Sequence, residues 1–317
     1  MYEWARAYGD PAAGFYNDNI RAETRDGPVN VRIPIHGADM MDLRPWREDR
    51  VLTAIAPHVA SAPRLLHTSI DPPFQVQEFI ADDVLNDIAP PGAAIPPHVL
   101  DDVVRLLTRV PRLPGTPAAW PDDGDTTAFA RLLSDLTQQV FDTHSQDYAD
   151  LFAALAVPAD PLEAVNDLWD GLTPRPFTCV HADLHRHNMI IANGETTFLD
   201  WELTLWGDPV YDLAAHIHKM AYLPEERAAL IACWRAAMPP DHITGWRQDL
   251  DAYLAHERIK SAIVDSVRYS QLSRGNGSYP EPQLIEIPHR QTQRGPLRLA
   301  HPAPIDARTV GKALSLQ

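Results

Sequence analysis

Lysine is scarce in this chain of 317 residues, because the first one is Lys219 and arginine is the long cation of the N-terminal two thirds. Positive charge is scarce as well, with 27 Lys and Arg against 43 Asp and Glu and a formal net charge of −16. Nucleic acids and anionic membranes are bound through basic surfaces. The composition therefore argues against both as partners and would suit a cationic substrate.

Cysteines and long apolar runs are also few. Cys179 and Cys233 lie in apolar segments without the spacing of metal ligands, and we expect two buried, reduced thiols. No apolar run approaches the roughly 20 residues of a membrane-spanning helix, and the N-terminus lacks a basic region followed by an apolar core. These absences lead us to expect a cytoplasmic protein.

The first 80 residues have the patterns of strands around one helix. Residues 19–24 and 29–33 alternate between polar and apolar side chains and flank the hairpin signal Asp26-Gly27. Residues 42–59 have helical periodicity, and residues 74–80 form an apolar run typical of a strand. A β-rich N-terminal region is therefore expected.

The chain beyond residue 96 has mainly helical patterns, interrupted by one β-like block. Helices are expected at 99–107, 129–141, 151–168, 211–220, 225–237 and 250–269, and short strands within 177–199. A chain of this length usually needs more than one hydrophobic core. We predict an α+β fold of two lobes, residues 1–80 and residues 81–272, joined by a connector near 77–84. Residues 273–317 are expected to form an extended or partly disordered arm.

The most informative segment is a polar loop between two apolar, strand-like pieces, residues 179–191. It contains Asp183 and, five residues later, Asn188, and the next strand-like piece ends at Asp200. Phosphoryl transfer needs a carboxylate that orients the acceptor hydroxyl and accepts its proton, together with oxygen ligands for Mg²⁺. One Asn and one Asp are sufficient, because Mg²⁺ retains several waters.

Three motifs follow one another here: His181-x-Asp183-x-x-x-x-Asn188, then Asp200, then residues 207–214 (Gly-Asp-Pro-Val-Tyr-Asp-Leu-Ala). Their joint spacing resembles that of the aminoglycoside phosphotransferase and choline kinase family. This resemblance implies a bilobal, protein-kinase-like fold with a small β-rich N-lobe and a larger, mainly helical C-lobe. It also implies ATP and Mg²⁺ as cofactors and a small molecule as the phosphoryl acceptor.

The resemblance further implies roles for individual residues. Asp183 would be the catalytic base, and Asn188 and Asp200 would bind Mg²⁺. His181 would brace the loop. Asp212 would begin a helix and hydrogen-bond back to the catalytic loop.

In the N-terminal lobe, the family places a nucleotide loop where this chain has residues 14–19. It also places a Lys, sometimes an Arg, on the third strand, paired with a Glu on the next helix. Because no lysine precedes Lys219, Arg32 would fill that position with Glu48 as its partner. Backbone groups near Gln77 and Phe79 would bind the adenine edge.

Other interpretations of these residues stay open at this point. Arg32 and Glu48 could form an ordinary surface ion pair, and the histidines near Asp183 could ligate zinc. The tryptophans Trp201, Trp206, Trp234 and Trp246 could cage a quaternary ammonium group or pack in the core. Glu257 and Asp265 could bind a cationic substrate or lie on a solvated helix face.

We predict an ATP- and Mg²⁺-dependent O-phosphotransferase acting on a small, amine-bearing molecule, with an antibiotic as the first candidate. The Ala-, Arg- and Pro-rich composition is typical of G+C-rich bacterial genes, and antibiotic self-resistance would fit such a source. The alternatives are a primary-metabolism kinase for choline, ethanolamine, homoserine or a thiosugar, and a catalytically silent nucleotide-binding pseudokinase. The sequence leaves the oligomeric state open.

Overall fold

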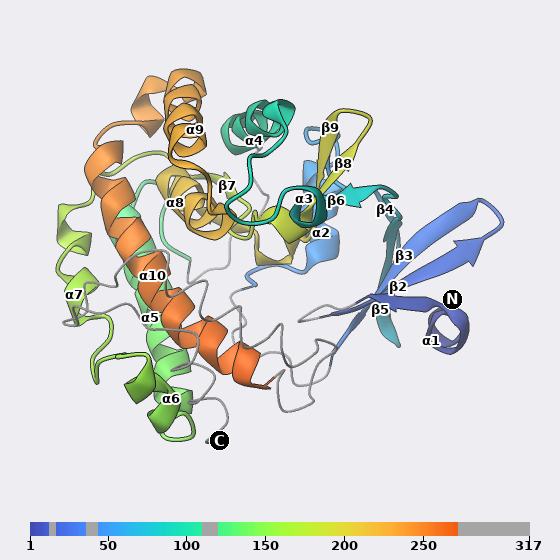
Figure 1. The fold of residues 1–317 in the computed structure, drawn as a ribbon, viewed down its shortest axis with the longest axis horizontal. Helices are drawn as coiled ribbons and strands as arrows, with labels where there is room; N and C mark the ends of the chain where they lie inside the picture. Colours follow the sequence, from blue (N-terminus) through green and yellow to red (C-terminus); the bar gives the residue numbers. More distant parts are fainter. Residues whose placement is uncertain (13–16, 36–43, 110–119, 272–317) are drawn as a thin grey trace. The chain divides into compact units, whose positions relative to one another are not determined.

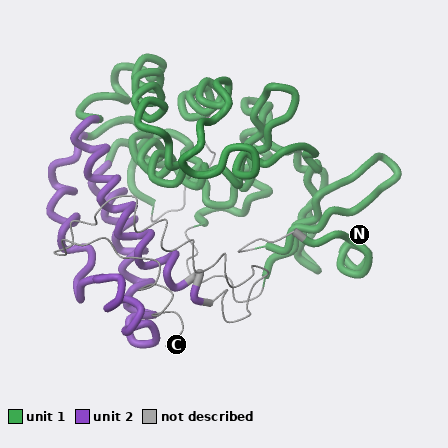
Figure 2. Tube along the Cα trace, viewed as in Figure 1, with its two compact units in different colours: residues 1–125, 174–246 green, residues 126–173, 247–317 purple. Residues whose placement is uncertain are grey.

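The structure is a computed structural model that describes residues 1–12, 17–35, 44–109 and 120–271. The chain forms two compact units, coloured green and purple in Figure 2. Unit 1 comprises Met1–Asp125 and Pro174–Trp246, and unit 2 comprises Thr126–Thr173 and Arg247–Gln317. Both units are therefore assembled from segments that lie far apart in the sequence.

A five-stranded antiparallel sheet forms the N-terminal part of unit 1 (Figure 1). The strand order is β1-β2-β3-β5-β4, and helix α1 packs against β2. The bounds are α1 Tyr2–Tyr8, β1 Asp10–Ala12, β2 Asn17–Thr24, β3 Gly27–Pro34, β4 Leu65–Ile70 and β5 Pro73–Glu78. The predicted hairpin is present: Thr24 pairs with Gly27, whose φ of 110° is a conformation that glycine adopts readily.

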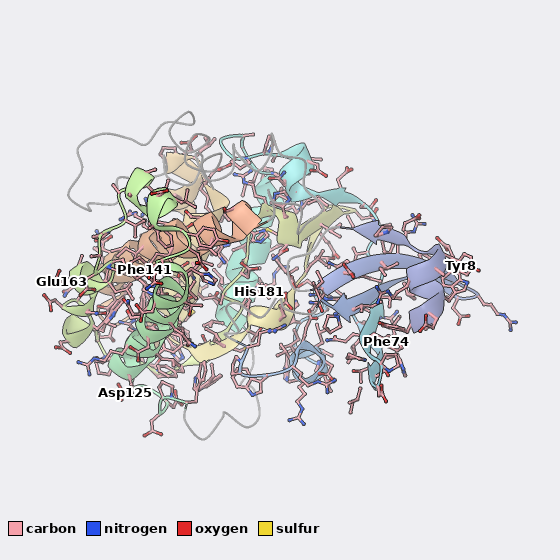
Figure 3. All side chains as sticks on the ribbon, turned by 90° about the horizontal axis from the view of Figure 1, so that it is seen from below. Tyr8, Phe74, Asp125, Phe141, Glu163 and His181 are labelled. Atoms are coloured by element: carbon pink, nitrogen blue, oxygen red, sulfur yellow. The ribbon has the colours of Figure 1, made fainter. Side chains whose placement is uncertain are left out.

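The alternating pattern of these strands explains which face of the sheet is buried. Side chains two residues apart point to the same face, so Val29, Val31 and Ile33 lie together. They form one apolar cluster with Ala5, Ile20, Ala22, Phe74 and Val76. Figure 3 labels Phe74 on β5 and Tyr8 at the end of α1.

Helix α2 begins later and ends earlier than predicted. It spans Glu48–Ile55, with Arg47 in extended conformation as its N-cap, and the predicted start at Asp42 lies outside the described residues. Pro45 does not lie in the first helical turn, because Arg44 to Arg47 are not helical. The buried face consists of Glu48, Val51, Leu52 and Ile55.

Two small sheets support the polar loop of the sequence motif. In the first, β6 Asp83–Val84 pairs with β8 Met189–Ala192, which pairs with β9 Glu195–Phe198. In the second, β7 Thr178–Val180 pairs with β10 Leu205–Gly207. The loop from His181 to Asn188 thus connects one sheet to the other.

The remaining helices of unit 1 surround these sheets. They are α3 Leu85–Ile88, α4 Pro97–Arg109, α8 Pro209–Met220 and α9 Pro224–Ala237, and α4 contacts both α8 and α9 (Figure 1). Helix α8 is buried along most of its length. Its N-terminus is capped by the Asp208 carboxylate, which accepts the Val210 N–H at 2.9 Å, and Pro209 occupies the first turn.

Unit 2 is built from helices α5 Thr126–His144, α6 Ala149–Ala154, α7 Glu163–Asn166 and α10 Trp246–Gln271. The single helix predicted at 151–168 is wrong, because Pro158 and Pro161 interrupt it and two short helices form instead. Trp169 and Tyr253 pack together in this unit with ring centroids 5.7 Å apart. Figure 3 labels Phe141 on α5 and Glu163 at the start of α7.

The predicted fold class is confirmed: an antiparallel N-terminal sheet is followed by a mainly helical region. The expectation of two buried thiols holds for Cys179 and is wrong for Cys233, which is exposed on α9 because Leu230 and Trp234 occupy the inward face. Within the described ranges, no helix is long and apolar enough to cross a membrane.

Candidate active site

The hairpin β8–β9 brings the two predicted metal ligands to the same end of a sheet. Met189 pairs with Phe198, and the Leu199 N–H donates to the Asn188 carbonyl at 2.8 Å. Asn188 and Asp200 therefore flank the open end of the hairpin. Asp200 has φ +63°, in the left-handed region that few residues other than glycine, Asn and Asp adopt, and this turn directs the chain away from β9.

The backbone of the catalytic loop is held by Asp212 of α8. Its two carboxylate oxygens accept the N–H groups of His181 at 3.0 Å and Ala182 at 2.8 Å. Ala182 has φ +61°, so these bonds stabilise a backbone conformation that is unfavourable for an L-residue. Burial raises the pKa of Asp212 to about 6. The loop contact predicted for Asp212 is thus present.

His181, labelled in Figure 3, braces the loop through both of its ring nitrogens. Its Nδ1 accepts the Asp183 N–H at 3.3 Å, so its Nε2 must be the protonated nitrogen that donates to the Leu199 carbonyl at 3.0 Å. Burial lowers the pKa of His181 to about 4. The ring also packs against Trp201 with centroids 4.5 Å apart.

Asp183 is paired with Lys219, a residue that the sequence motif did not indicate. The Lys219 ammonium binds Asp183 Oδ1 and also donates to the Ala182 carbonyl at 3.2 Å. The other oxygen, Oδ2, lies 3.4 Å from the side-chain nitrogen of Asn188 and 3.7 Å from His185 Nε2. Burial alone would raise the pKa of Asp183, but Lys219 and His185 hold it well below its usual range.

A sequence signal for Lys219 exists in the periodicity of α8. His216 and Lys219 follow Asp212 by four and seven residues, so all three share one helical face. His216 donates from Nδ1 to the Leu184 carbonyl at 3.1 Å and accepts at Nε2 from the Tyr222 hydroxyl at 2.7 Å. Once Asp212 is assigned to the loop, this spacing predicts that Lys219 also contacts it.

Arg32 lies beside Glu48, as the resemblance implied, and also reaches the catalytic segment. Its Nε is 3.2 Å from Glu48 Oε2, and its Nη2 donates to Asp200 Oδ1 at 2.7 Å. The Arg32 and Glu48 side chains are only 6% and 4% exposed, so the surface ion-pair interpretation is wrong. Although burial would lower the pKa of the guanidinium, the carboxylates around it raise the value above its usual range.

Glu202 is a second site residue that the motif did not single out. Its Oε2 accepts from the Asn17 side chain at 2.9 Å and lies 3.6 Å from Arg44, while its Oε1 lies 3.7 Å from Arg32. Burial and the neighbouring Asp200 carboxylate raise the pKa of Glu202. Asn17 is the first described residue of the predicted nucleotide loop at 14–19, whose residues 14–16 lie outside the described ranges.

Gln77 and Phe79, the two residues expected near the adenine edge, lie in different environments. Gln77 is buried inside β5, between Asn30 of β3 and Leu65 of β4, and its side-chain nitrogen lies 3.5 Å from Gln75 Oε1. Phe79 follows the end of β5 in the connector to β6, and Arg21 stacks over its ring with 5.0 Å from Cζ to the centroid. Their assignment to the adenine edge stays a prediction.

The proposed metal ligands fit a hard cation. The Asn188 side-chain nitrogen donates to the Asp183 carbonyl at 3.0 Å, so the amide oxygen is directed away from that bond and is available as a ligand. Asp200 uses Oδ1 for Arg32, and its side chain remains 28% exposed. Oxygen donors of this kind suit Mg²⁺. In the described part of the chain, no group of three or more His, Cys, Asp or Glu side chains is arranged to hold a metal ion.

Two further interpretations of the sequence are corrected. A cage built from the four tryptophans does not form: Trp201, Trp206 and Trp234 are buried, and Trp234 packs against Trp246 with centroids 6.1 Å apart. In unit 2, Glu257 does not lie on a solvated face. It is buried and bound to Lys260 at 2.5 Å.

The chain belongs to the phosphotransferase enzyme family (APH), whose profile matches residues 10–248, more than half of the sequence. It is therefore a small-molecule phosphotransferase with a hydroxyl group as acceptor, as the motif predicted. A search of curated protein sequences found no match.

Solved structures of this fold class are similar to the chain. The choline kinase LicA from Streptococcus pneumoniae has a TM-score of 0.53 at 14% identity, covering 92% of this chain and 95% of that one. LicA in complex with AMP has a TM-score of 0.53 at 15% identity, covering 99% and 96%. A candidate aminoglycoside phosphotransferase from Ralstonia eutropha has a TM-score of 0.54 at 17% identity, covering 99% of this chain and 97% of that one. The predicted kinase-like fold is thus confirmed.

Proposed function

We propose that the protein uses ATP and Mg²⁺ to phosphorylate a hydroxyl group of a small, amine-bearing molecule, with an antibiotic as the first candidate. The observation that carries this proposal is the Asp183 carboxylate, which binds Lys219 and lies 3.4 Å from the side-chain nitrogen of Asn188, at the end of the hairpin that also carries Asp200. A low pKa keeps the carboxylate able to accept a hydrogen bond from the acceptor hydroxyl. Asp183 is the proposed catalytic residue.

The proposed nucleotide site involves the N-terminal sheet. Arg32 and Glu48 lie at its inner side, next to Asp200, and the guanidinium has the planar donor geometry that binds phosphate oxygens. Asn188 and Asp200 are the proposed Mg²⁺ ligands. When bound, Mg²⁺ would neutralise charge on the phosphates. Nucleotide use is also supported by the AMP bound to LicA.

The choice of an amine-bearing acceptor rests on charge and on the relatives. A net charge of −16 favours the approach of cationic molecules. The similar structures include a choline kinase and a candidate aminoglycoside phosphotransferase, and both choline and the aminoglycosides contain amine or ammonium groups. The primary-metabolism kinase remains the second candidate, and the LicA similarity favours it.

A screen of ATP consumption tests the proposal. The purified protein is incubated with ATP and Mg²⁺ and a panel of aminoglycosides, peptide and nucleoside antibiotics, choline, ethanolamine, homoserine and thiosugars. We expect ADP release that depends on one acceptor class and on Mg²⁺. Turnover with choline or ethanolamine alone would assign the second candidate. Tight ATP binding without turnover on any acceptor would contradict the proposal and favour a pseudokinase.

A further inference from the structure

One face of α8 contributes three side chains to the catalytic loop. Asp212, His216 and Lys219 lie at positions i, i+4 and i+7 of the helix, and each binds an atom of residues 181–184. The first two bind only backbone groups of the loop. Lys219 alone also binds a side chain, the Asp183 carboxylate. Its contact therefore bears on the orientation of the proposed catalytic group.

We propose that Lys219 is a positioning residue that fixes the Asp183 carboxylate through Oδ1 and leaves Oδ2 to accept the proton of the acceptor hydroxyl. This inference rests on the proposed function. The two oxygens differ clearly: Oδ1 forms the ion pair, whereas the Oδ2 contacts of 3.4 Å and 3.7 Å are longer than good hydrogen bonds. Oδ2 is thus the oxygen with capacity for a strong new hydrogen bond.

Burial makes this ion pair more effective than a surface pair. The side chains of Lys219 and Asp183 are 23% and 17% exposed, so water screens their attraction only partly. The lysine also binds the Ala182 carbonyl, which anchors the ammonium to the loop at a second point. Because α8 is buried along most of its length, the ammonium is presented from a rigid element.

The chemical step assigns a separate task to each group. The acceptor oxygen forms a bond to the γ-phosphorus of ATP, and the bond from that phosphorus to the bridging oxygen of ADP breaks, with its electron pair leaving on ADP. The proton of the acceptor hydroxyl moves to Asp183 Oδ2. Lys219 acts on this step through Asp183, which it holds in place.

The test compares Lys219→Met and Lys219→Gln with Lys219→Arg, using the full-length protein and its confirmed acceptor. Without the ammonium, the carboxylate can rotate away from its productive orientation, and misplacement of this kind can lower a rate by about 100-fold. We expect both uncharged variants to lower kcat by about 10- to 100-fold, with the KM values for ATP and acceptor within about three-fold of wild type. Lys219→Arg should recover most of the loss because it keeps the cation.

The matched control is Arg235→Met, which removes an exposed cation from the last turn of α9, whereas Lys219→Met removes a partly buried cation from the last turn of α8. It should leave kcat unchanged. A kcat close to wild type in either uncharged variant, or a loss confined to KM, would overturn the inference. If Lys219→Met does not fold, the inference is tested by comparing kcat of the folded Lys219→Gln and Lys219→Arg proteins. Failure of the proposed function is seen separately, as the absence of turnover by the wild-type protein on every acceptor of the panel.

Discussion

Arg32 is a buried cation that connects the N-terminal sheet to the catalytic segment. It lies on β3 and contacts three carboxylates: Glu48 at 3.2 Å, Asp200 at 2.7 Å and Glu202 at 3.7 Å. A lysine in its place would have one ammonium group, whereas the guanidinium reaches Glu48 through Nε and Asp200 through Nη2. The arginine is thus suited to bridging both residues at once.

We therefore expect Arg32→Met to lower the free energy of unfolding by about 3–5 kcal/mol, because it leaves buried carboxylates without their cation. Arg32→Lys should cost less than half as much, since it retains the charge. Urea unfolding followed by circular dichroism measures both values. Equal stability of Arg32→Met and wild type would show that the carboxylates do not depend on Arg32.

The sequence predicted the residues of this site whose spacing is local. Asp183, Asn188 and Asp200 were found because one loop and one hairpin bring them together, and the hairpin register accounts for the closeness of the last two. Lys219 and Glu202 were missed. The Lys219 contact follows from the periodicity of α8 only once Asp212 is assigned to the loop. The Glu202 contacts depend on how the segment after β9 packs, which no short motif specifies.

Among the elements, α8 organises the catalytic loop. Asp212 fixes its backbone at one end and Lys219 binds its carboxylate, while His216 lies between them and is fully buried. Burial lowers the pKa of His216 to about 3. The ring is therefore neutral in the folded protein at any pH near 7, and the Tyr222 hydroxyl donates to its unprotonated nitrogen.

This burial predicts a pH-dependent stability. The folded-state pKa of about 3 lies below the unfolded value of about 6.5, so the unfolded chain binds the extra proton as the pH falls through this window. His216 therefore reduces stability below about pH 6.5, by up to roughly 1.4 kcal/mol per pH unit. His216→Gln should show a shallower rise of unfolding free energy between pH 4.5 and 6.5 than wild type, measured by urea titration at each pH. Parallel pH profiles would contradict this prediction.

The elements themselves were predictable to different degrees. Strands β2 and β3 were evident because one face is apolar and the turn between them is short. The errors at α2 and at residues 151–168 have a common cause. In both segments the helical spacing of apolar residues continues past a proline, so the apolar pattern predicted too long a helix. The proline geometry, which the apolar pattern does not take into account, ended or delayed the helix.

At the scale of the whole molecule, the family match assigns one class of chemistry, phosphoryl transfer to a small molecule. The predicted lobe boundaries near residues 80 and 272 stay predictions, and the predicted arm at 273–317 lies outside the described residues. The acceptor could not be predicted from the sequence, because its recognition depends on side chains brought together by tertiary packing rather than on a local motif.

The central claim is that Asp183 is the catalytic residue of an ATP-dependent phosphotransferase. The most direct test compares wild type with Asp183→Asn, which keeps the size of the side chain and removes its charge, by following the phosphorylated acceptor by mass spectrometry with ATP and Mg²⁺ at saturation. Because a positioned acid–base group contributes about 10²–10⁴-fold, we expect kcat to fall by that factor. A kcat within a few-fold of wild type would show that Asp183 is not the catalytic residue.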